Sequence, residues 1–310
     1  MEDNSKETNQ ITEVEKFKIF EIEFDNNIDF LKNFTDLVIF SGRIISFIST
    51  EKVHIVNSTL LESSIQTLKS IKLCCSIGSF SDANTLIRKL RDDLLQYVYV
   101  LAIINRRKTF TQKSLENFKM DSVEQIIVGF SELEFNEMTN DELAVEAWLS
   151  NKVLELPYNV KKKLGFEDYM KILKLDSNVN EILLEYQLHK YWEHLQTKLN
   201  NYVHNNGTQF AQHNLIKSNN PNLEIYYQNI NIRSSYVITF FLVLITMVDS
   251  TLLCSGDIQD YLEDDIEPPE NCQYEIAPFI QEYINRKVVP LHPELKEFLQ
   301  KNNSHGMKIE

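Results

Sequence analysis

Apolar residues recur every three or four positions along most of the chain, which is the pattern of helices that bury one face. The pattern is clearest after the turn SFSD at residues 79–82. There it predicts a helix of about six turns, capped by Ser81 or Asp82. Its apolar positions are Ala83, Leu86, Leu90, Leu94, Tyr97, Leu101 and Ile104.

The segment before this turn predicts a second helix, antiparallel to the first. Residues 59–62 (TLLE) have the form of a capping box, and Gly78 ends the helix that they open. Because the connecting loop is short, the two helices should form a hairpin. Further upstream, residues 17–24 fit a short strand or the start of a helix, and a helical pattern runs from 28 to 48.

Other helices are predicted in the second half of the chain. Residues 139–142 (TNDE) form a second capping box, which opens a helix through Val153. A long helix is predicted over 179–206, with Gly207 as its left-handed cap. Residues 236–248 (YVITFFLVLITMV) are apolar on every side, which predicts the central helix of the fold.

These patterns predict an all-α protein, an irregular multi-helix bundle built on long antiparallel helices with one fully apolar central helix. We expect a disordered acidic tail at residues 1–16, a single domain at 17–300 and a C-terminal tail at 301–310. Within the domain, residues 157–165 mark a weak subdivision and residues 257–270 form an acidic loop.

The composition excludes several kinds of function. The 310 residues include only 7 Gly and 7 Pro, as expected for long helices. The isolated glycines form neither GxGxxG nor GxxxxGK[ST], so phosphate-binding loops of the Rossmann and P-loop kinds are excluded. HExxH, GxSxG and CxxC are also absent, and no two histidines have the spacing of paired ligands. We therefore expect no metal site and no cofactor.

The charge and the apolar run bear on the partners. The chain has 45 Asp and Glu against 31 Lys and Arg, a net charge of -14, so its average field repels phosphate. Binding of RNA would need a local basic pocket or a basic partner chain. The run 236–248 is shorter than the roughly 20 residues of a membrane span, and four cysteines without pairing motifs suit a reducing compartment. We expect a cytoplasmic protein without a membrane partner; membrane association is the minor alternative.

Two motifs offer candidate chemistry. In RKLRDDLLQY (88–97), Arg88 and Asp92 are four residues apart and face one another, and Arg91 lies on the same side. Two arginines at this spacing can hold a phosphate or a carboxylate. The alternative is a salt-bridged helix face or an internal ion pair that fixes packing.

The second motif is KLNNYVHNNG (198–207), at the end of the long helix. Its His204 projects away from the buried side, together with Asn200. A polar face with a histidine can support acid–base catalysis near neutral pH. The alternative is a histidine that interacts with the helix dipole, beside a simple Asn-Asn-Gly stop signal.

SFSDANTLIRKLRDDLLQYVYVL, followed about a hundred residues later by LNNYVHNNG, resembles uncharacterised all-helical bacterial proteins similar to the HEPN superfamily (higher eukaryotes and prokaryotes nucleotide-binding domains). The resemblance covers roughly residues 55–253. It implies a helical bundle, a homodimer and a place in toxin–antitoxin or antiphage defence. Many HEPN proteins are metal-independent ribonucleases that carry an Arg followed by a polar residue and, four to six residues later, a His.

By this resemblance His204 matches the family's histidine and would be the acid–base group, and Asn200 would orient it. The family's arginine has no match, since Lys198 stands six residues before His204; Arg88 and Arg91 from the facing helix would replace it as a charge clamp. The expected catalytic residues are His204, Asn200, Arg88 and Arg91. The expected substrate-binding residues are Lys198, Tyr202, Asn205, Asn206 and Asp92.

Two functions follow from the sequence. The first is a HEPN-like protein of bacterial defence or stress response that binds RNA or a nucleotide and, as an enzyme, is a metal-independent endoribonuclease. The alternative is a non-catalytic helical module that binds a partner protein in a defence or toxin–antitoxin complex. The net charge and the unmatched arginine favour the second; the polar face with His204 and the Arg88–Arg91 pair favour the first.

Overall fold

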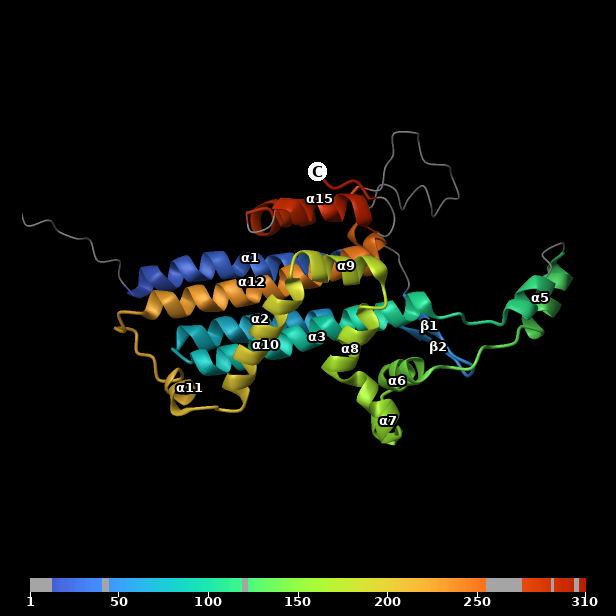
Figure 1. Cartoon of the computed structure of the whole chain (residues 1–310), viewed down its shortest axis with the longest axis horizontal. Helices are drawn as coiled ribbons and strands as arrows, with labels where there is room; N and C mark the ends of the chain where they lie inside the picture. Colours follow the sequence, from blue (N-terminus) through green and yellow to red (C-terminus); the bar gives the residue numbers. More distant parts are fainter. Residues whose placement is uncertain (1–12, 41–44, 119–121, 255–274, 291–292, 304–306) are drawn as a thin grey trace, which may run out of the picture.

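The protein is seen in a computed structural model that describes residues 13–40, 45–118, 122–254, 275–290, 293–303 and 307–310 (Figure 1). The described residues are 74% helical and contain a single small sheet of two strands. The all-α prediction is therefore confirmed.

Four long helices make up the centre of the molecule: α1 (Glu13–Phe40), α2 (Thr59–Ser76), α3 (Phe80–Arg106) and α12 (Leu223–Val248). α2 packs against α1 and α3, and α12 packs against the same two helices, so the four close into a bundle. α2 runs opposite to the other three (Figure 1). A long connection, residues 107–222, joins α3 to α12 and carries most of the shorter helices.

α2 and α3 form the predicted antiparallel hairpin, and a glycine permits its tight loop. Gly78 has a φ of +76°, and a Cβ there would lie 2.1 Å from the carbonyl oxygen of Ile216, so no other residue fits. α3 begins at Phe80, slightly earlier than predicted. Its cap is Ser79, whose hydroxyl donates to Asp82 at 2.7 Å.

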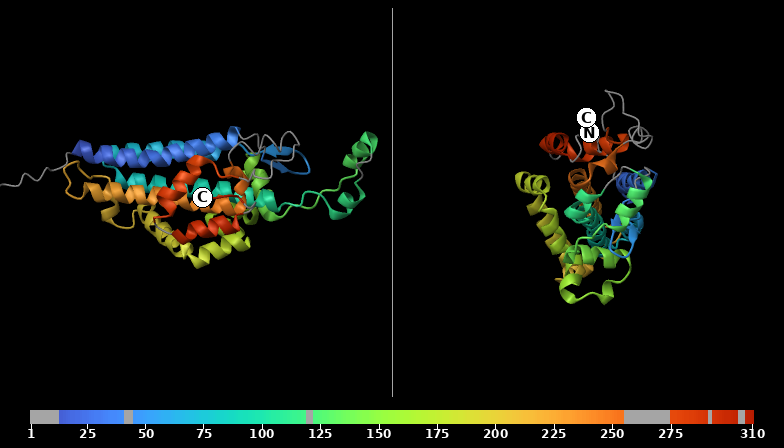
Figure 2. Two further views of the ribbon diagram at one scale, coloured as in Figure 1. Left: turned by 90° about the horizontal axis from the view of Figure 1, so that it is seen from above. Right: turned by 90° about the vertical axis from the view of Figure 1, so that its right-hand side faces the viewer.

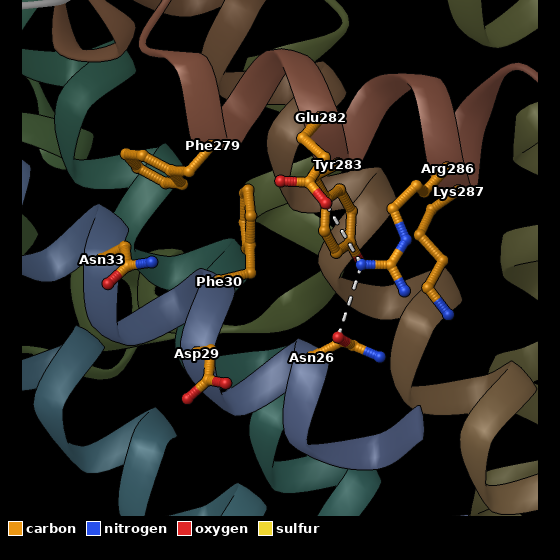
Figure 3. A pocket seen from close by; sticks show the side chains of 9 residues that line it. All are labelled: Asn26, Asp29, Phe30, Asn33, Phe279, Glu282, Tyr283, Arg286 and Lys287. Atoms are coloured by element: carbon orange, nitrogen blue, oxygen red, sulfur yellow. Dashed lines mark hydrogen bonds and ion pairs between the residues drawn. The ribbon is translucent and has the colours of Figure 1, made fainter. Parts of the chain in front are cut away.

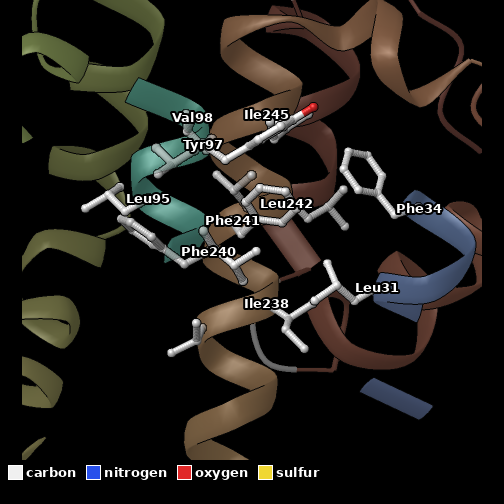
Figure 4. Packing of buried hydrophobic residues seen from close by; sticks show 14 of the residues in the cluster. Leu31, Phe34, Leu95, Tyr97, Val98, Ile238, Phe240, Phe241, Leu242 and Ile245 are labelled. Carbon is white, nitrogen blue, oxygen red and sulfur yellow. The ribbon is translucent and has the colours of Figure 1, made fainter. Parts of the chain in front are cut away.

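The apolar part of α12 is the predicted central helix, because it is covered by both α1 and α3 (Figure 4). Phe241 lies edge-on to Phe34 of α1 at 5.4 Å between ring centroids, and Tyr97 of α3 lies 6.3 Å from the same ring. Phe241 is 3% exposed. Burial of this helix on all sides accounts for its lack of a polar face.

Shorter elements surround the bundle. They are β1 (Ser46–Ile48), β2 (Val53–Ile55), α4 (Gln112–Asn117), α5 (Val123–Ser131), α6 (Asn140–Leu149), η1 (Val153–Glu155), α7 (Tyr158–Lys161), η2 (Lys162–Leu164), α8 (Phe166–Leu173), α9 (Ser177–Glu185), α10 (Leu188–Val203), α11 (Thr208–Gln212), η3 (Ser250–Leu253), α14 (Pro278–Tyr283), η4 (Ile284–Val288) and α15 (Pro293–Asn302). α8 and α10 pack on α3, while α9, α15 and η4 contact α12.

The first helix confirms one of the two alternatives for its start and differs from the prediction at its end. Residues 17–24 are helical, and α1 stops at Phe40 rather than continuing to 48. The chain then forms an antiparallel hairpin in which Ser46 faces Ile55. Phe47 in this hairpin is 1% exposed, whereas Ile45 and Ile48, whose three-residue spacing suggested a helix, are half-buried.

Of the two predicted capping boxes, one is confirmed. The Thr139 hydroxyl accepts from the backbone of Glu142, whose carboxylate accepts from the backbone of Thr139 at 2.8 Å. At the start of α2 the cap is Ser58 instead of Thr59, and its hydroxyl donates to the Glu62 carboxylate at 2.5 Å.

The long helix predicted over 179–206 is two helices, α9 and α10, with a turn at Gln187 between them. Gln187 takes a left-handed φ of 53°, which a continuous helix does not allow. The ring nitrogen Nδ1 of His189 lies 2.8 Å from the carbonyl oxygen of Leu183, which satisfies an acceptor that the break exposes. The second helix ends at Val203, and the left-handed residue after it is Asn205 (φ 46°).

The ends of the fold also differ from the sequence prediction. α1 already begins at Glu13, inside the predicted tail. The C-terminal tail returns to the core, since Met307 and Ile309 are 2% and 5% exposed. The predicted acidic loop, 257–270, lies outside the described residues.

α4 and α5 form an arm that stands away from the bundle (Figures 1 and 2). The sequence pattern predicts no element between residues 109 and 138. Phe110 and Phe135 pair at the base of the arm, with ring centroids 5.0 Å apart. Near the tip, Phe118 contacts Phe130 edge-on at 5.2 Å, so the arm is a folded hairpin of helices.

Among the described residues, α12 is long and apolar enough to cross a membrane by length and composition. Within the structure, 72% of its apolar window is buried. Core helices commonly meet the same criterion, so α12 is weak evidence for a membrane span.

Candidate functional site

The first predicted cluster is an internal ion pair. Arg91 of α3 is 1% exposed, and its Nε and Nη2 donate to Asp92 Oδ1 at 2.9 and 2.6 Å. Its guanidinium carbon lies 4.3 Å from the ring centroid of Phe166 on α8 and 5.8 Å from that of Trp192 on α10. Burial lowers the pKa of Arg91, and Asp92 opposes that effect. Arg91 is therefore enclosed by protein groups and is a poor clamp for a large anion.

Arg88 shares the same carboxylate from the solvent side. Its Nε lies 3.8 Å from Asp92 Oδ2, which places the two side chains face to face as their four-residue spacing predicts. The side chain of Arg88 is 30% exposed and that of Asp92 is 38% exposed. Asp92 thus joins both arginines, and the sequence alternative of a salt-bridged helix face describes this geometry.

The second predicted cluster lies at the other end of α10. His204 follows the helix directly and is exposed, as are its neighbours Asn205 and Asn206 and the preceding Lys198. Asn206 donates to the side-chain oxygen of Asn201 at 3.0 Å. These residues form a polar helix end that faces solvent.

The structure does not bring the two clusters together. Trp192 lies beside Arg91, and His204 is twelve residues further along the chain. At 1.5 Å per residue, about 18 Å of helix separates their levels. His204 and Arg91 therefore cannot act on the same phosphate from these positions.

A third cluster, which sequence analysis missed, lies next to the end of α10. We call Tyr202, His213 and Arg233 the α10-end cluster. The Tyr202 ring lies 5.8 Å from the His213 ring and 5.6 Å from the Arg233 guanidinium carbon. Arg233, from α12, also donates to the side-chain oxygen of the buried Asn84 on α3. Four segments of the chain thus meet here, and each of the three side chains is half-buried.

The electrostatics of the α10-end cluster favour a neutral histidine. Burial lowers the pKa of His213, and the positive charge of Arg233 lowers it further. Nδ1 of His213 and Oδ1 of Asn200 are buried and have no hydrogen-bond partner among the described residues. A neutral imidazole beside a fixed guanidinium is able to accept a proton while the cation holds an anion.

One sequence signal could have found this cluster. Arg233 is the one charged residue between Gln228 and Val248, in a segment that is otherwise apolar or neutral. A charge placed in a core helix usually has a partner or a function. His213 gives no comparable signal, because its loop carries no pattern.

The described residues contain no group of three or more His, Cys, Asp or Glu able to hold a metal ion. Cys74, Cys75 and Cys254 are free thiols. Burial raises the pKa of Cys74 and, far more, that of Cys75, which makes both thiols poor nucleophiles.

Comparisons with protein-family models, with curated proteins and with solved structures gave no match to this chain. The similarity to the HEPN superfamily therefore rests on the sequence motifs alone.

Proposed function

We propose that the chain is a non-catalytic helical interaction module, HEPN-like in architecture, that works within a bacterial defence or toxin–antitoxin complex. The observation that supports this proposal is the arm formed by α4 and α5. It projects from the bundle (Figures 1 and 2). Most of the apolar side chains of α5 are exposed.

The exposed side of α5 is strongly apolar. Val123, Ile127, Val128 and Phe130 are 73%, 65%, 53% and 64% exposed, and no described side chain of this helix is buried. A helix of nine residues is marginal in water without tertiary packing. A partner surface on α5 would supply the packing that the bundle does not.

A second copy of the chain fits this surface. The nine residues of α5 include one charged residue, Glu124, in a chain whose net charge is -14. Arm-to-arm pairing therefore brings apolar surfaces together while most of the acidic residues stay apart. A two-fold axis through the arms would use the same patch on both copies, which is the usual geometry of a homodimer.

Light scattering on the purified full chain tests the pairing. The parent is expected to have the mass of a dimer, and Ile127→Asp the mass of a monomer, because the new carboxylate would be buried against its symmetry mate. The matched control is Leu154→Asp, which changes an apolar side chain that is 87% exposed on η1, away from the arm. A monomeric parent, or a dimer that Ile127→Asp leaves intact, contradicts the pairing.

The α10-end cluster supports a second candidate function, RNA or nucleotide binding with metal-independent cleavage. In that reaction a base removes the proton of a 2′-hydroxyl, the resulting oxygen attacks the adjacent phosphorus, and the 5′-oxygen leaves with a proton. His213 or His204 would be the base and Arg233 would stabilise the charge on the phosphate.

A cleavage assay with single-stranded RNA in the presence of a chelator separates the two functions. A non-catalytic module leaves the RNA intact. If the parent cleaves the RNA and His204→Ala or His213→Ala abolishes cleavage, the chain is a ribonuclease. The proposal of a non-catalytic module then fails. Cleavage that both variants and Arg233→Ala retain at the parental rate excludes this cluster as the catalyst; Arg88→Ala is the matched control.

A further inference from the structure

A hollow of about 590 Å³ lies between α10, α12, η4 and α15, on a different side of α12 from α3. Its walls are mostly apolar. The apolar residues include Leu188, Tyr191, Tyr236, Phe240, Val243 and Leu295. Pockets for small organic ligands typically have 300–1,000 Å³ and this kind of lining.

One end of the hollow is polar. Arg286 and Lys287 reach it from η4, a turn of π-helix, and Glu23 and Asn231 reach it from α1 and α12. Single π-helical turns widen a helix and are frequent at functional sites. The lining at this end thus holds two cations and the Glu23 carboxylate, and Arg286 is also paired with Glu282 from outside the hollow.

The two cations differ in their partners. Arg286 Nη1 lies 3.5 Å from Asn26 Oδ1 and 3.4 Å from Glu282 Oε1, across a smaller hollow of about 180 Å³ on its other side (Figure 3). Lys287 has no ion pair within 4.0 Å among the described residues. Burial lowers the pKa of Lys287, while Glu23 raises it and Arg286 lowers it. Lys287 thus lines the hollow as a cation that is available to pair with a ligand.

Asn231 supplies an independent sign of a ligand. It is 8% exposed, and its Nδ2 donates to Glu23 Oε2 at 3.1 Å. Its Oδ1 is buried and has no partner within the described part of the chain. Buried amide oxygens are normally hydrogen-bonded, so this acceptor calls for a donor from a molecule in the hollow.

We propose that this hollow binds a small amphipathic carboxylic acid, with its apolar body between α10 and α12, its carboxylate at Lys287 and Arg286, and a donor group of the ligand or its hydration at Asn231. The apolar walls supply most of the binding free energy, and the cations select for negative charge. The hollow uses other residues than the arm and the α10-end cluster, so the binding proposal is tested independently of the proposed function.

Tryptophan fluorescence can report binding. Trp192 stacks on Phe240 with ring centroids 4.0 Å apart, and Phe240 lines the hollow. Trp148, on α6, is the only other tryptophan in the sequence, so the full chain with Trp148→Phe carries a single reporter. Titration uses three probes with the same tail: decanoate, decanol and decyltrimethylammonium.

Decanoate is expected to bind at least about tenfold more tightly than decanol, because a hydrogen bond to a charged group contributes on that scale. Lys287→Gln should remove this preference, and Lys287→Glu should reverse it in favour of the cationic probe. The matched control is Lys301→Gln on α15, where the lysine is 73% exposed and should leave the affinity unchanged.

Equal affinity for decanoate and decanol in the parent would overturn the proposal, as would a Lys287→Gln protein that keeps the parental preference. Absence of any probe binding at millimolar concentration would overturn it as well. Inorganic phosphate, titrated alone, should not bind measurably, because it lacks the apolar body; if it competes with decanoate, the cations are a general anion site and the carboxylic acid assignment is wrong.

Discussion

α12 and α5 are both apolar helices, and the protein uses them in opposite ways. In α12 the residues from Phe240 to Met247 are all buried, whereas the described side chains of α5 are half-exposed or exposed. The difference does not lie in local composition, since both segments combine β-branched and aromatic residues. It lies in neighbours, because α1 and α3 pack along α12, whereas α5 is contacted by Phe118 of its own arm and leaves most of its apolar side chains exposed. An exposed apolar helix that the core does not cover is where an external partner is expected.

The sharpest way to test this contrast is to delete one aromatic ring from each helix. Phe241→Ala in α12 should lower the free energy of unfolding by about 3–5 kcal/mol, since the ring is buried against Phe34 and Tyr97 and its loss leaves a cavity. Phe130→Ala in α5 should change it by less than about 0.5 kcal/mol. Chemical denaturation of both variants measures the difference. Equal losses would mean that the arm is part of the cooperative core.

A second test compares the two arginines of α3. Arg91→Ala should cost about 2 kcal/mol, because the desolvated guanidinium packs on Phe166 and Trp192. Arg88→Ala should cost less than about 0.5 kcal/mol, since its pair with Asp92 is solvent-exposed. Denaturant titration at one pH and salt concentration gives both values. If Arg91→Ala leaves the free energy of unfolding unchanged, the ion pair is dispensable for packing. A binding role for Arg91 would then have to be considered again.

A third test uses two helix caps of the same kind. Thr139 caps α6 at the foot of the arm, and Ser122 caps α5 on the arm itself, each accepting a backbone N–H at 3.3 Å. Thr139→Ala should cost about 1 kcal/mol of global stability. Ser122→Ala should leave the global transition in place and loosen only α5, which hydrogen exchange of the α5 amides would detect. If Ser122→Ala lowers the global free energy of unfolding as much as Thr139→Ala does, the arm unfolds together with the core.

Sequence reasoning succeeded where the physics is local. Most of the α3 stripe is buried because its spacing matches the helical repeat, and only Leu86 and Ile104 of the stripe are half-buried. The Arg88–Asp92 contact follows from a four-residue separation on one helix. The capping box at Thr139 needs only residues within one turn. The apolar run of α12 exceeds what one face can bury, which makes a central position the natural outcome.

The remaining features depend on tertiary neighbours. The turn at Gln187 interrupts an apolar pattern that has no breaker residue, so the pattern alone predicts one helix. The expected meeting of His204 with Arg91 required a particular level of α10 beside α3, and Trp192 occupies that level instead. His213 and Arg233 are twenty residues apart on different elements, and only the fold makes them neighbours.

The smallest expected effect is the contribution of His213, in the α10-end cluster, to the pH dependence of stability. The pKa of His213 is lowered from its ordinary 6.5, first by burial and then by Arg233. The unfolded chain therefore takes up this proton at a higher pH than the folded chain does. Between those two pKa values the unfolded state binds more protons, so stability is present above pH 6.5 and falls as the pH drops through the lowered value.

His213→Gln removes this proton uptake, so its free energy of unfolding should fall less than that of the parent between pH 7 and the acid side of 6.5. Arg233→Gln should give an intermediate slope, because burial is the larger cause and remains in that variant. Denaturant titrations at several pH values, each variant measured against the parent, isolate the contribution of this one group. Parallel curves for the parent and His213→Gln would show that the pKa of the imidazole is the same in the folded and the unfolded chain. The α10-end cluster would then be a solvated surface without the electrostatics of a binding site.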